Sequence, residues 1–457
     1  MITSATASSS AQFIIFLKRA STSLFPFFSL IALSLCADSS LADSSTVSTP
    51  TPKVIEYNLD LAIKRALAEN FQVTEAQKEL EKQQSLVTNI RGKMLPQLGA
   101  TGAYNKTDTG LIPSVGGRAF GNATTWNGGV ELSQSLFSGG SGINSLRKQQ
   151  LLADAAALGV SAIQQAVIYQ TKKAFFDVLL ARRTIEVQEQ LVQLREETLS
   201  SERNKFEAGT ISNFEVLRAE VALANSRTPL IQAKNGLNIS EEELKRVLAL
   251  SESSIKIAGN LDKDSLPLTT IDEARAVAMK HRPDLQQLSL LVEAQERGVN
   301  VQLAEYLPKI TAYSNYTYRN NPFGESGTLD GWQVGVRGTW NIFDSFAREG
   351  AVNAARTDQK LAQIDHERLS QDIAVEVSQA MLSWAEAQQL LEASQQVVTQ
   401  AAESERLARA RLDVGAATQL DLLDSQVQLT EARTNEIKAL HKLNVTKAAI
   451  ERAVGGF

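Results

Sequence analysis

The sequence contains two copies of one plan, and this duplication restricts the fold more than any other feature. At an offset of 212 residues, the matching positions are Ala62 with Ala274, Ala66 with Ala278, Leu95-Pro96 with Leu307-Pro308, and Tyr104 with Tyr316. Beyond one loop the offset falls to 206, and the matches are Trp126 with Trp332, Phe137 with Phe343, and Gly209 with Gly415. A unit of about 200 residues is far longer than a solenoid repeat. We therefore predict two related halves, residues 54–260 and 261–457, each ordered helix, strand, loop, strand, long helix, turn, helix.

Each half contains stretches that alternate between apolar and polar residues, the pattern of a half-buried β-strand. Residues 332–342 alternate in this way, and so does the equivalent stretch at 126–136. Their expected partners are residues 97–107 and 309–319, which are rich in Tyr and Thr. About 11 residues is the length of a tilted strand that crosses a membrane. The same alternation also describes a soluble antiparallel hairpin, so both interpretations stay open at this point.

Aromatic residues concentrate in these four stretches and at their edges. Five of the seven Tyr and three of the four Trp lie there, as an aromatic girdle at the membrane interface requires. The predicted girdle residues are Tyr104, Trp126, Tyr316, Tyr318, Trp332 and Trp340.

Two long segments are predicted to be helices. Residues 143–205 and 348–411 contain no proline, and each would extend roughly 95 Å as a helix. Apolar residues recur at intervals of seven in both segments, at Val178, Ile185, Val192 and Leu199, and at Val377, Trp384, Leu391 and Val398. Such spacing indicates coiled-coil packing against partner helices.

Composition excludes several classes of function. The 51 acidic and 46 basic residues give a net charge of −5, without the basic excess of a nucleic-acid-binding protein. One Cys and three His rule out a disulfide framework and make a metal site improbable. No cluster of acid, base and nucleophile emerges, so we expect neither catalysis nor a cofactor. The glycine-rich residues 139–142 lack the Lys of a phosphate-binding loop and are interpreted as a strand-to-helix junction.

The N-terminus is predicted to be a targeting segment. Lys18 and Arg19 precede an apolar run from Leu24 to Leu35, which is too short to span a bilayer as a helix. We interpret residues 1–42 as a signal peptide cleaved after Ala42, and residues 43–53 as a flexible leader. A second interpretation is lipidation at Cys36, although the bulky Leu35 is unfavourable there. Both place the mature protein outside the cytoplasm.

Four membrane strands cannot close a barrel, because the open edges would leave backbone groups unpaired in lipid. Three chains would supply twelve strands around a water-filled lumen, with the long helices forming a hollow tunnel below. The tandem halves therefore resemble the TolC-type outer-membrane efflux and secretion channels of Gram-negative bacteria (outer membrane factors). The resemblance is carried by Leu95-Pro96 and its copy, Gln134-Ser135-Leu136-Phe137, Val414-Gly415 before Asp421-Leu422-Leu423-Asp424, and Leu443-Asn444-Val445.

This resemblance implies a mainly helical fold with a small membrane β part and four strands per chain in a twelve-stranded trimeric barrel. It further implies a periplasmic α-barrel that docks onto a periplasmic adaptor (membrane fusion) protein and an inner-membrane pump. The chain would be the passive exit duct of a tripartite efflux pump or a type I secretion system. The alternative is a secreted coiled-coil scaffold with small soluble hairpins, which a carbonate wash of membranes would distinguish.

The helix–turn–helix tips hold the candidate functional residues. Gly209 and Gly415 end long helices as left-handed caps, and the resemblance implies that Gly209, Thr210, Val414 and Gly415 face the adaptor. Capping boxes are predicted at Ser212-x-x-Glu215 and Thr418-x-x-Asp421. Asp421 and Asp424 lie three residues apart on one helix face, so three chains would place rings of carboxylates at the periplasmic entrance. Ala417 stands where the family often has a basic residue.

Overall fold

The computed structural model describes residues 55–112, 114–115, 118–119, 121–251, 255–263, 270–321 and 327–456. The predicted signal peptide, the leader and Cys36 lie outside these residues. The first half contains β1 (Ile55–Tyr57), α2 (Leu59–Glu69), α3 (Phe71–Lys93), β2 (Gln97–Lys106), η1 (Thr109–Leu111), β3 (Ser114–Val115), β4 (Arg118–Ala119), β5 (Thr124–Phe137), α4 (Ser141–Glu207), α5 (Asn213–Val247) and β6 (Ile255–Ile257). The second contains α6 (Ile271–His281), α7 (Pro283–Leu303), η2 (Ala304–Tyr306), β7 (Lys309–Asn320), β8 (Thr328–Thr339), α8 (Ala347–Asp413) and α9 (Gln419–Ala453).

Both long helices are present and exceed the predicted lengths. α4 and α8 each have 67 residues, or about 100 Å of helix. β8 ends at Thr339, so Trp340 and Ile342, which the alternation placed in the strand, lie beyond its end. Each half also begins with two helices instead of one, because the chain is extended at Asn70 and at Arg282.

Those two breaks occupy the same position of the repeat, and each is tied to the end of its half. The Nδ2 of Asn70 donates to the carbonyl of Val247 at 2.8 Å. Arg282, 212 residues later, donates through Nη1 to the carbonyl of Ala453 at 3.3 Å. Asn70 also caps α3, since its Oδ1 accepts from the backbone N–H of Gln72 at 2.9 Å. The repeat therefore preserves the bond while the side chain that makes it changes.

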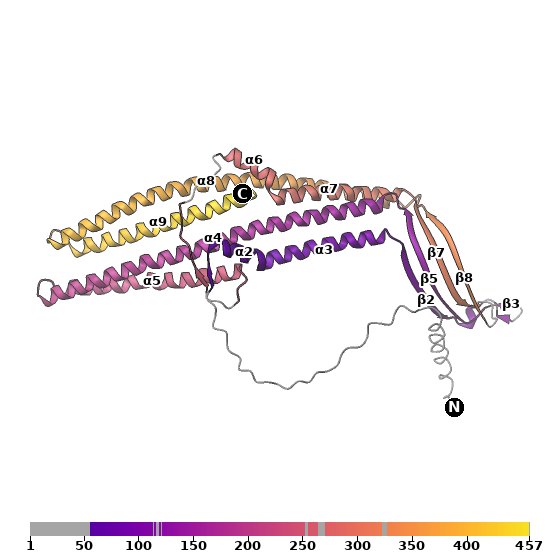
Figure 1. Cartoon of the computed structure of the whole chain (residues 1–457), viewed down its shortest axis with the longest axis horizontal. Helices are drawn as coiled ribbons and strands as arrows, with labels where there is room; N and C mark the ends of the chain where they lie inside the picture. Colours follow the sequence, from indigo (N-terminus) through magenta and orange to yellow (C-terminus); the bar gives the residue numbers. More distant parts are fainter. Residues whose placement is uncertain are drawn as a thin grey trace, which may run out of the picture. The chain divides into compact units, whose positions relative to one another are not determined.

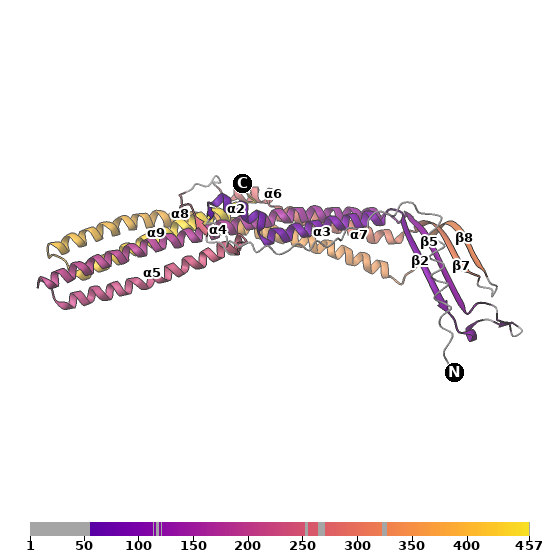
Figure 2. The same ribbon diagram turned by 60° about the horizontal axis from the view of Figure 1, so that its bottom comes forward.

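The main sheet joins the two halves through its centre. Its order is β2-β5-β7-β8, and all three pairings are antiparallel. β5 of the first half pairs with β7 of the second, with Val130 opposite Tyr316. β2 and β8 are left as the edge strands (Figures 1 and 2). A separate parallel pair joins β1 to β6.

The helices form an open row in the same order as the strands. α3 packs on α4, α4 on α7, and α7 on α8, next to the sheet. Towards the turns, α5 packs on α4, α4 on α9, and α9 on α8. The two helical hairpins α4–α5 and α8–α9 are visible in Figure 1. α4 and α9 make the main contact between them.

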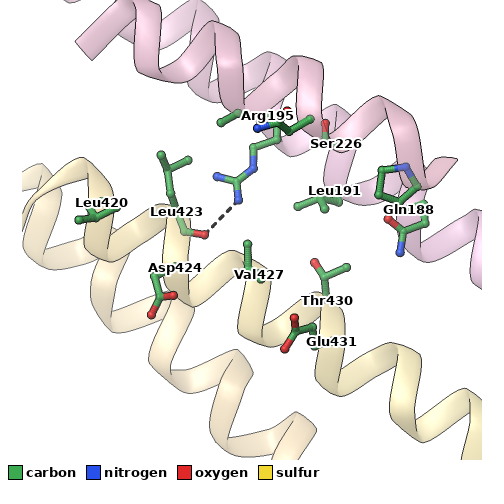
Figure 3. Close-up of a pocket in the computed structure, with 13 residues that line it drawn as sticks. Gln188, Leu191, Arg195, Ser226, Leu420, Leu423, Asp424, Val427, Thr430 and Glu431 are labelled. Atoms are coloured by element: carbon green, nitrogen blue, oxygen red, sulfur yellow. Dashed lines mark hydrogen bonds between the residues drawn. The ribbon is translucent and has the colours of Figure 1, made fainter. Parts of the chain in front are cut away.

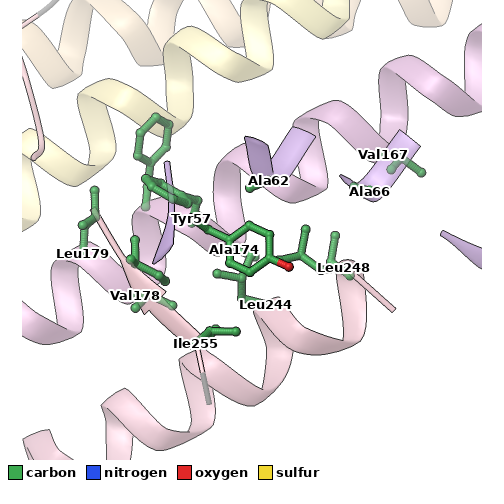
Figure 4. Packing of buried hydrophobic residues seen from close by; sticks show 14 of the residues in the cluster. Tyr57, Ala62, Ala66, Val167, Ala174, Val178, Leu179, Leu244, Leu248 and Ile255 are labelled. Carbon is green, nitrogen blue, oxygen red and sulfur yellow. The ribbon is translucent and has the colours of Figure 1, made fainter. Parts of the chain in front are cut away.

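The core of each half forms where a short helix lies on a long one. α2 packs on α4 and α6 packs on α8, through alanines that are fully buried: Ala62, Ala66, Ala274 and Ala278. Their small side chains let the short helices approach closely, and this explains their recurrence in the sequence. Tyr57, Val178 and Leu244 fill the first core (Figure 4). Val377, Trp384 and Leu391 fill the second, as the heptad pattern predicts.

The strand-to-helix junctions require left-handed backbone in both halves. Gly139 and Gly140 have φ values of 64° and 85°. The equivalent Ser345 and Phe346 adopt 57° and 68° without being glycine. A Cβ on Gly139 would lie 2.5 Å from the carbonyl oxygen of Ala304, so glycine is required there. The glycine-rich segment is therefore a junction with a structural reason.

One helix among the described residues, α4, contains an 18-residue window that is long and apolar enough to cross a membrane by composition alone. A single such window is weak evidence for a membrane span, because core helices meet the same criteria. Only 17% of the window is buried within the chain.

Candidate functional site

The two hairpin tips share one backbone geometry. Gly209 and Gly415 have φ values of 71° and 73°, the left-handed conformation that the sequence predicts. The N–H of Thr210 donates to Lys205 at 3.0 Å, and that of Ala416 to Arg411 at 2.8 Å, which completes a Schellman motif at each helix end. A Cβ on either glycine would meet no atom within 4 Å. These glycines are needed for backbone conformation, and the space around them is open.

Val414 is 78% exposed and lies directly before Gly415. Thr210 is also exposed, although its Oγ1 donates to the Lys205 carbonyl at 2.8 Å. The four predicted docking residues thus lie at the surface of the two turns, where a partner could contact them.

Asp421 is held in a capping box at the start of α9. Its Oδ2 accepts from the backbone N–H of Thr418 at 2.8 Å and from the Thr418 hydroxyl at 2.7 Å. The N–H of Asp421 in turn donates to Thr418 Oγ1 at 3.3 Å. The backbone N–H of Thr418, followed by its hydroxyl and the charge of Arg411, lowers the pKa of Asp421 below its ordinary value. Asp421 is therefore firmly ionised at neutral pH.

The capping box predicted at Ser212 is wrong. The Ser212 side chain makes no cap hydrogen bond, and Glu215 instead pairs with Arg218, with 3.5 Å between Oε2 and Nη1. Arg218 has a second contact that holds it in place, its guanidinium lying 4.8 Å from the Phe214 ring centroid. The nearby cation outcompetes the Ser212 backbone for the carboxylate.

This difference gives the two tips opposite character. At the offset of 206, Asp421 and Asp424 of the second half correspond to Glu215 and Arg218 of the first. The first half places an ion pair there, whereas the second half places two acids. The start of α9 therefore carries two acids where the start of α5 carries one acid and one base.

Asp421 and Asp424 line one shallow depression of about 400 Å³ between α8 and α9, together with Arg411 and Ala417. Asp424 is exposed and accepts from Gln428 Nε2 at 2.7 Å. The predicted common face for the two acids is therefore present. Among the described residues, no group of three or more His, Cys, Asp or Glu is arranged to hold a metal ion.

Arg195 is a residue that the sequence did not single out. It lies on α4, is only 4% exposed, and donates from Nη1 to Gln426 Oε1 at 2.8 Å and from Nη2 to the Leu423 carbonyl at 3.0 Å. Burial lowers its pKa below the ordinary value, but a guanidinium stays charged in proteins. Arg195 borders a groove of about 520 Å³ that is lined from α4, α5 and α9 and includes Asp424 (Figure 3). Only its four-residue spacing from Leu199, which is buried against α5, could have signalled its burial.

The sheet presents two chemically distinct faces. Even-numbered positions of β8 carry Trp332, Val334 and Val336, all exposed in the single chain. Odd-numbered positions carry Gln333 and Arg337. On β5 the same division separates Val130 and Leu132 from Glu131 and Ser133. On β7, Tyr316 lies opposite Val130 and Asn315 opposite Glu131 in keeping with it, whereas Ser314 opposite Leu132 and Tyr313 opposite Ser133 depart from it. An apolar face suits lipid and a polar face suits a water-filled lumen.

Five of the six residues predicted to form the girdle lie in the strands, on the face that carries Val130 and Val334. Tyr104 is paired across the strands with Trp126, Tyr316 is paired with Trp332, and the rings of Trp126 and Tyr318 are 5.4 Å apart. At the other end of β8, Trp340 Nε1 donates to the carbonyl of Tyr306 at 3.1 Å. From Trp332 to the end of β8 at Thr339 the strand rises by seven residues, or about 24 Å, which is close to the apolar height of a membrane barrel, and Trp340 follows directly.

Comparison with known proteins identifies the family. The profile of the outer membrane efflux protein family matches residues 62–250 and again residues 275–456. The chain belongs to this family. It is an outer-membrane efflux channel protein, and the tandem match agrees with the two related halves of its fold. It is located in the outer membrane of a Gram-negative bacterium, with its helices in the periplasm.

Curated relatives match along most of their length. The outer membrane protein TolC of Vibrio cholerae is 24% identical over 379 residues, covering 81% of this chain and 84% of TolC. The efflux protein BepC of Brucella suis is 24% identical over 430 residues, covering 90% and 88% of the two chains. The fold matches the CmeC outer membrane channel of Campylobacter jejuni with a TM-score of 0.75 at 18% identity, covering 87% and 85%.

Proposed function

We propose that this outer membrane efflux protein works as a homotrimer that forms the passive exit duct of a tripartite pump. One observation carries the proposal: the strands form an open sheet, the helices form an open row, and both follow the same order along the chain's surface. The sheet ends at β2 and β8, and the helical row ends at α3 and α8. Because the chain passes from α3 into β2 and from β8 into α8, a neighbouring copy would extend both rows together.

Closure of the sheet favours three copies. Open strand edges in lipid would leave backbone N–H and C=O groups unpaired. Two copies would give eight strands, whose interior is filled by side chains, whereas three copies give twelve and leave room for a lumen. The polar face with Gln333 and Arg337 would then line that lumen.

The mass of the detergent-extracted particle tests this assembly. Light scattering with the detergent contribution subtracted should give three chains from the membrane fraction. A monomer or dimer recovered without detergent would contradict the shared barrel and favour the scaffold interpretation.

We infer that Asp421 and Asp424 form the charged part of the periplasmic entrance. Three chains would supply six carboxylates at the start of α9. None of the described ion pairs includes Asp421 or Asp424, although Arg411 lines the same depression and its charge acts on Asp421. Such rings attract cations and resist anions at a narrow opening. Replacing both by Asn should weaken cation preference and block in planar bilayers, while Glu215→Gln, at the equivalent first-half position, should change it little. Equal block in all three proteins would contradict the proposal.

The exposed turns at Gly209, Thr210, Val414 and Gly415 are the proposed contact with a periplasmic adaptor, which would connect the channel to an inner-membrane pump. Relatives of this chain include a probable efflux pump outer membrane protein, TtgC of Pseudomonas putida. Site-directed crosslinking from Val414 and from the lipid-face residue Val334 tests the contact. An adaptor crosslinked from Val414 alone supports it, and crosslinking from neither position removes the support.

The aromatic girdle and the absence of catalysis complete the proposal. Tyr104, Trp126, Tyr316, Tyr318 and Trp332 would mark one membrane interface, and Trp340 the other. The chain would supply a path without chemistry, and the energy for transport would come from the inner-membrane partner. A purified channel that hydrolyses a nucleotide would contradict this part.

A further inference from the structure

Each helical hairpin has an apolar cluster between its two helices. Leu199, Val216 and Leu223 fill the α4–α5 seam, and Ala401, Leu429 and Ala432 fill the α8–α9 seam. Ion pairs cross the same seams, for example Arg203 with Glu220 and Lys442 with Glu386, so each hairpin is held by both apolar and polar contacts.

The α4–α9 seam, which joins the hairpins, is crossed by a series of polar contacts. From the sheet side towards the tips these are Lys172 with Glu451, Asp177 with His441 at 2.7 Å, and Arg433 with Gln190 at 2.9 Å. In the described part of the chain, the hydrogen bonds of Arg195 are the last ones across this seam before the tips. Beyond it, α4 continues for twelve residues to Glu207 (207 − 195).

Arg195 is an unusual group to bury at this point. Its charge contacts neutral acceptors, the amide of Gln426 and the carbonyl of Leu423, and none of the described ion pairs includes it. Gln426 is 1% exposed, and its Nε2 has no hydrogen-bond partner among the described residues. A buried charge is expensive to maintain for stability alone, because an apolar seam of similar volume is often as stable. The arrangement is thus better explained by a requirement for position.

The acceptors show what is positioned. Leu423 is adjacent to Asp424 and two residues from Asp421, and Gln426 follows two residues after Asp424. A backbone carbonyl cannot move independently of its helix, so a bond to Leu423 fixes α9 itself. The bidentate fork of the guanidinium fixes both the height and the rotation of α9 on α4.

We propose that Arg195 is a positioning residue that fixes the first turns of α9, and the carboxylates of Asp421 and Asp424 with them, against α4. The proposal rests on the acidic entrance inferred above. Without Arg195 the hairpins would remain intact, but their tips would no longer have a defined separation.

The first test measures the tip separation within one chain, and it holds whatever the oligomeric state is. Glu207→Cys and Asp413→Cys place spin labels at exposed, repeat-equivalent positions at the ends of α4 and α8. The single native Cys36 lies in the predicted signal peptide, so only the introduced cysteines would be labelled in the mature chain. Labelled chains are diluted into unlabelled ones, and the distance distribution is measured by pulsed electron paramagnetic resonance.

Arg195→Met should at least double the width of this distribution, whereas Arg433→Met is the matched control on the same seam and should leave it within about 20% of wild type. Arg195→Lys, which keeps the charge but loses the fork, should give an intermediate width. The double variant Arg195→Met with Gln426→Met should narrow the distribution again, because the seam becomes apolar. Equal widths for Arg195→Met, Arg433→Met and wild type would falsify the proposal.

The second test measures block of the channel by spermidine in planar bilayers. Arg195→Met should weaken block about tenfold with the particle mass unchanged, while Arg433→Met should change it less than twofold. If the wild type is not blocked at all, the acidic entrance is wrong, and the distance measurement still decides the role of Arg195. If Arg195 had a purely structural role, Arg195→Met and Arg195→Lys would lower heat stability equally, and spermidine block would not be weaker in Arg195→Met than in Arg433→Met. That result would overturn the proposal.

Discussion

Arg282 holds the break between α6 and α7 to two other helices, and its replacement tests the repeat-based account of the fold. Its guanidinium contacts Asp284 at 2.6 Å, Glu376 on α8, and the Ala453 carbonyl at the end of α9. The equivalent Asn70 makes only the carbonyl bond and the helix cap. Arg282 itself supplies no side-chain cap to α7. Arg282→Ala removes every bond, whereas Arg282→Asn transplants the first-half solution into the second half.

The magnitudes follow from these contacts. Removing one partner of a buried ion pair costs about 3–5 kcal/mol. Water reaches Asp284 and Glu376, whose side chains are 29% and 37% exposed, so we expect the lower value, about 3 kcal/mol, for Arg282→Ala. Arg282→Asn should recover about 1 kcal/mol from the bond to Ala453 and a similar amount from capping α7. The Asn variant should thus be only about 1 kcal/mol less stable than wild type.

The pH dependence has a defined sign. Burial of Asp284 opposes its ionisation, but hydrogen bonds and charge from Arg282 outweigh this and lower its pKa. Its contribution to stability is therefore present above its ordinary pKa of about 3.9 and is lost as the pH falls through the lower, folded-state value. Guanidinium unfolding of the detergent-extracted protein, followed by circular dichroism at pH 7 and pH 3, should show the wild-type advantage over Arg282→Ala shrinking at pH 3. Equal instability of the Ala and Asn variants at pH 7 would refute the reasoning.

The remaining predictions use pairs of similar changes. Leu391→Ala should cost about 2–5 kcal/mol of unfolding free energy because Leu391 is 1% exposed, whereas Leu390→Ala, at 44% exposure, should cost under about 0.5 kcal/mol. Gly415→Ala should cost about 1 kcal/mol for its left-handed backbone, whereas Gly139→Ala should also force the backbone apart at Ala304 and abolish assembly in expression trials. In an Asp424→Asn channel, spermidine block should persist below pH 4, because the Thr418 bonds lower the pKa of Asp421; loss of block near pH 5 would oppose this.

Local patterns in the sequence predicted most of the secondary structure. Period two located β5 and β8, heptads located α4 and α8, and glycine marked both hairpin ends. These signals depend only on residues that are close in the sequence, so they can be recognised before the fold is known. The prediction of a capping box at Ser212 was wrong because it considered only Ser212 and Glu215. Arg218, three residues after Glu215, pairs with that carboxylate instead.

The sequence by itself determined that the chain has two related halves, with strands of membrane length, long coiled-coil helices and an acidic pair on one tip. Only the tertiary structure decided that β5 meets β7 at the centre of the sheet, and that Arg195 reaches Gln426 across 231 residues of sequence. The physical reason is that sequence periodicity defines which face of a helix or strand is apolar, but it does not define which other helix or strand packs against that face. Arg195 looks like a solvent-exposed residue among Glu and Gln until α9 is placed against α4.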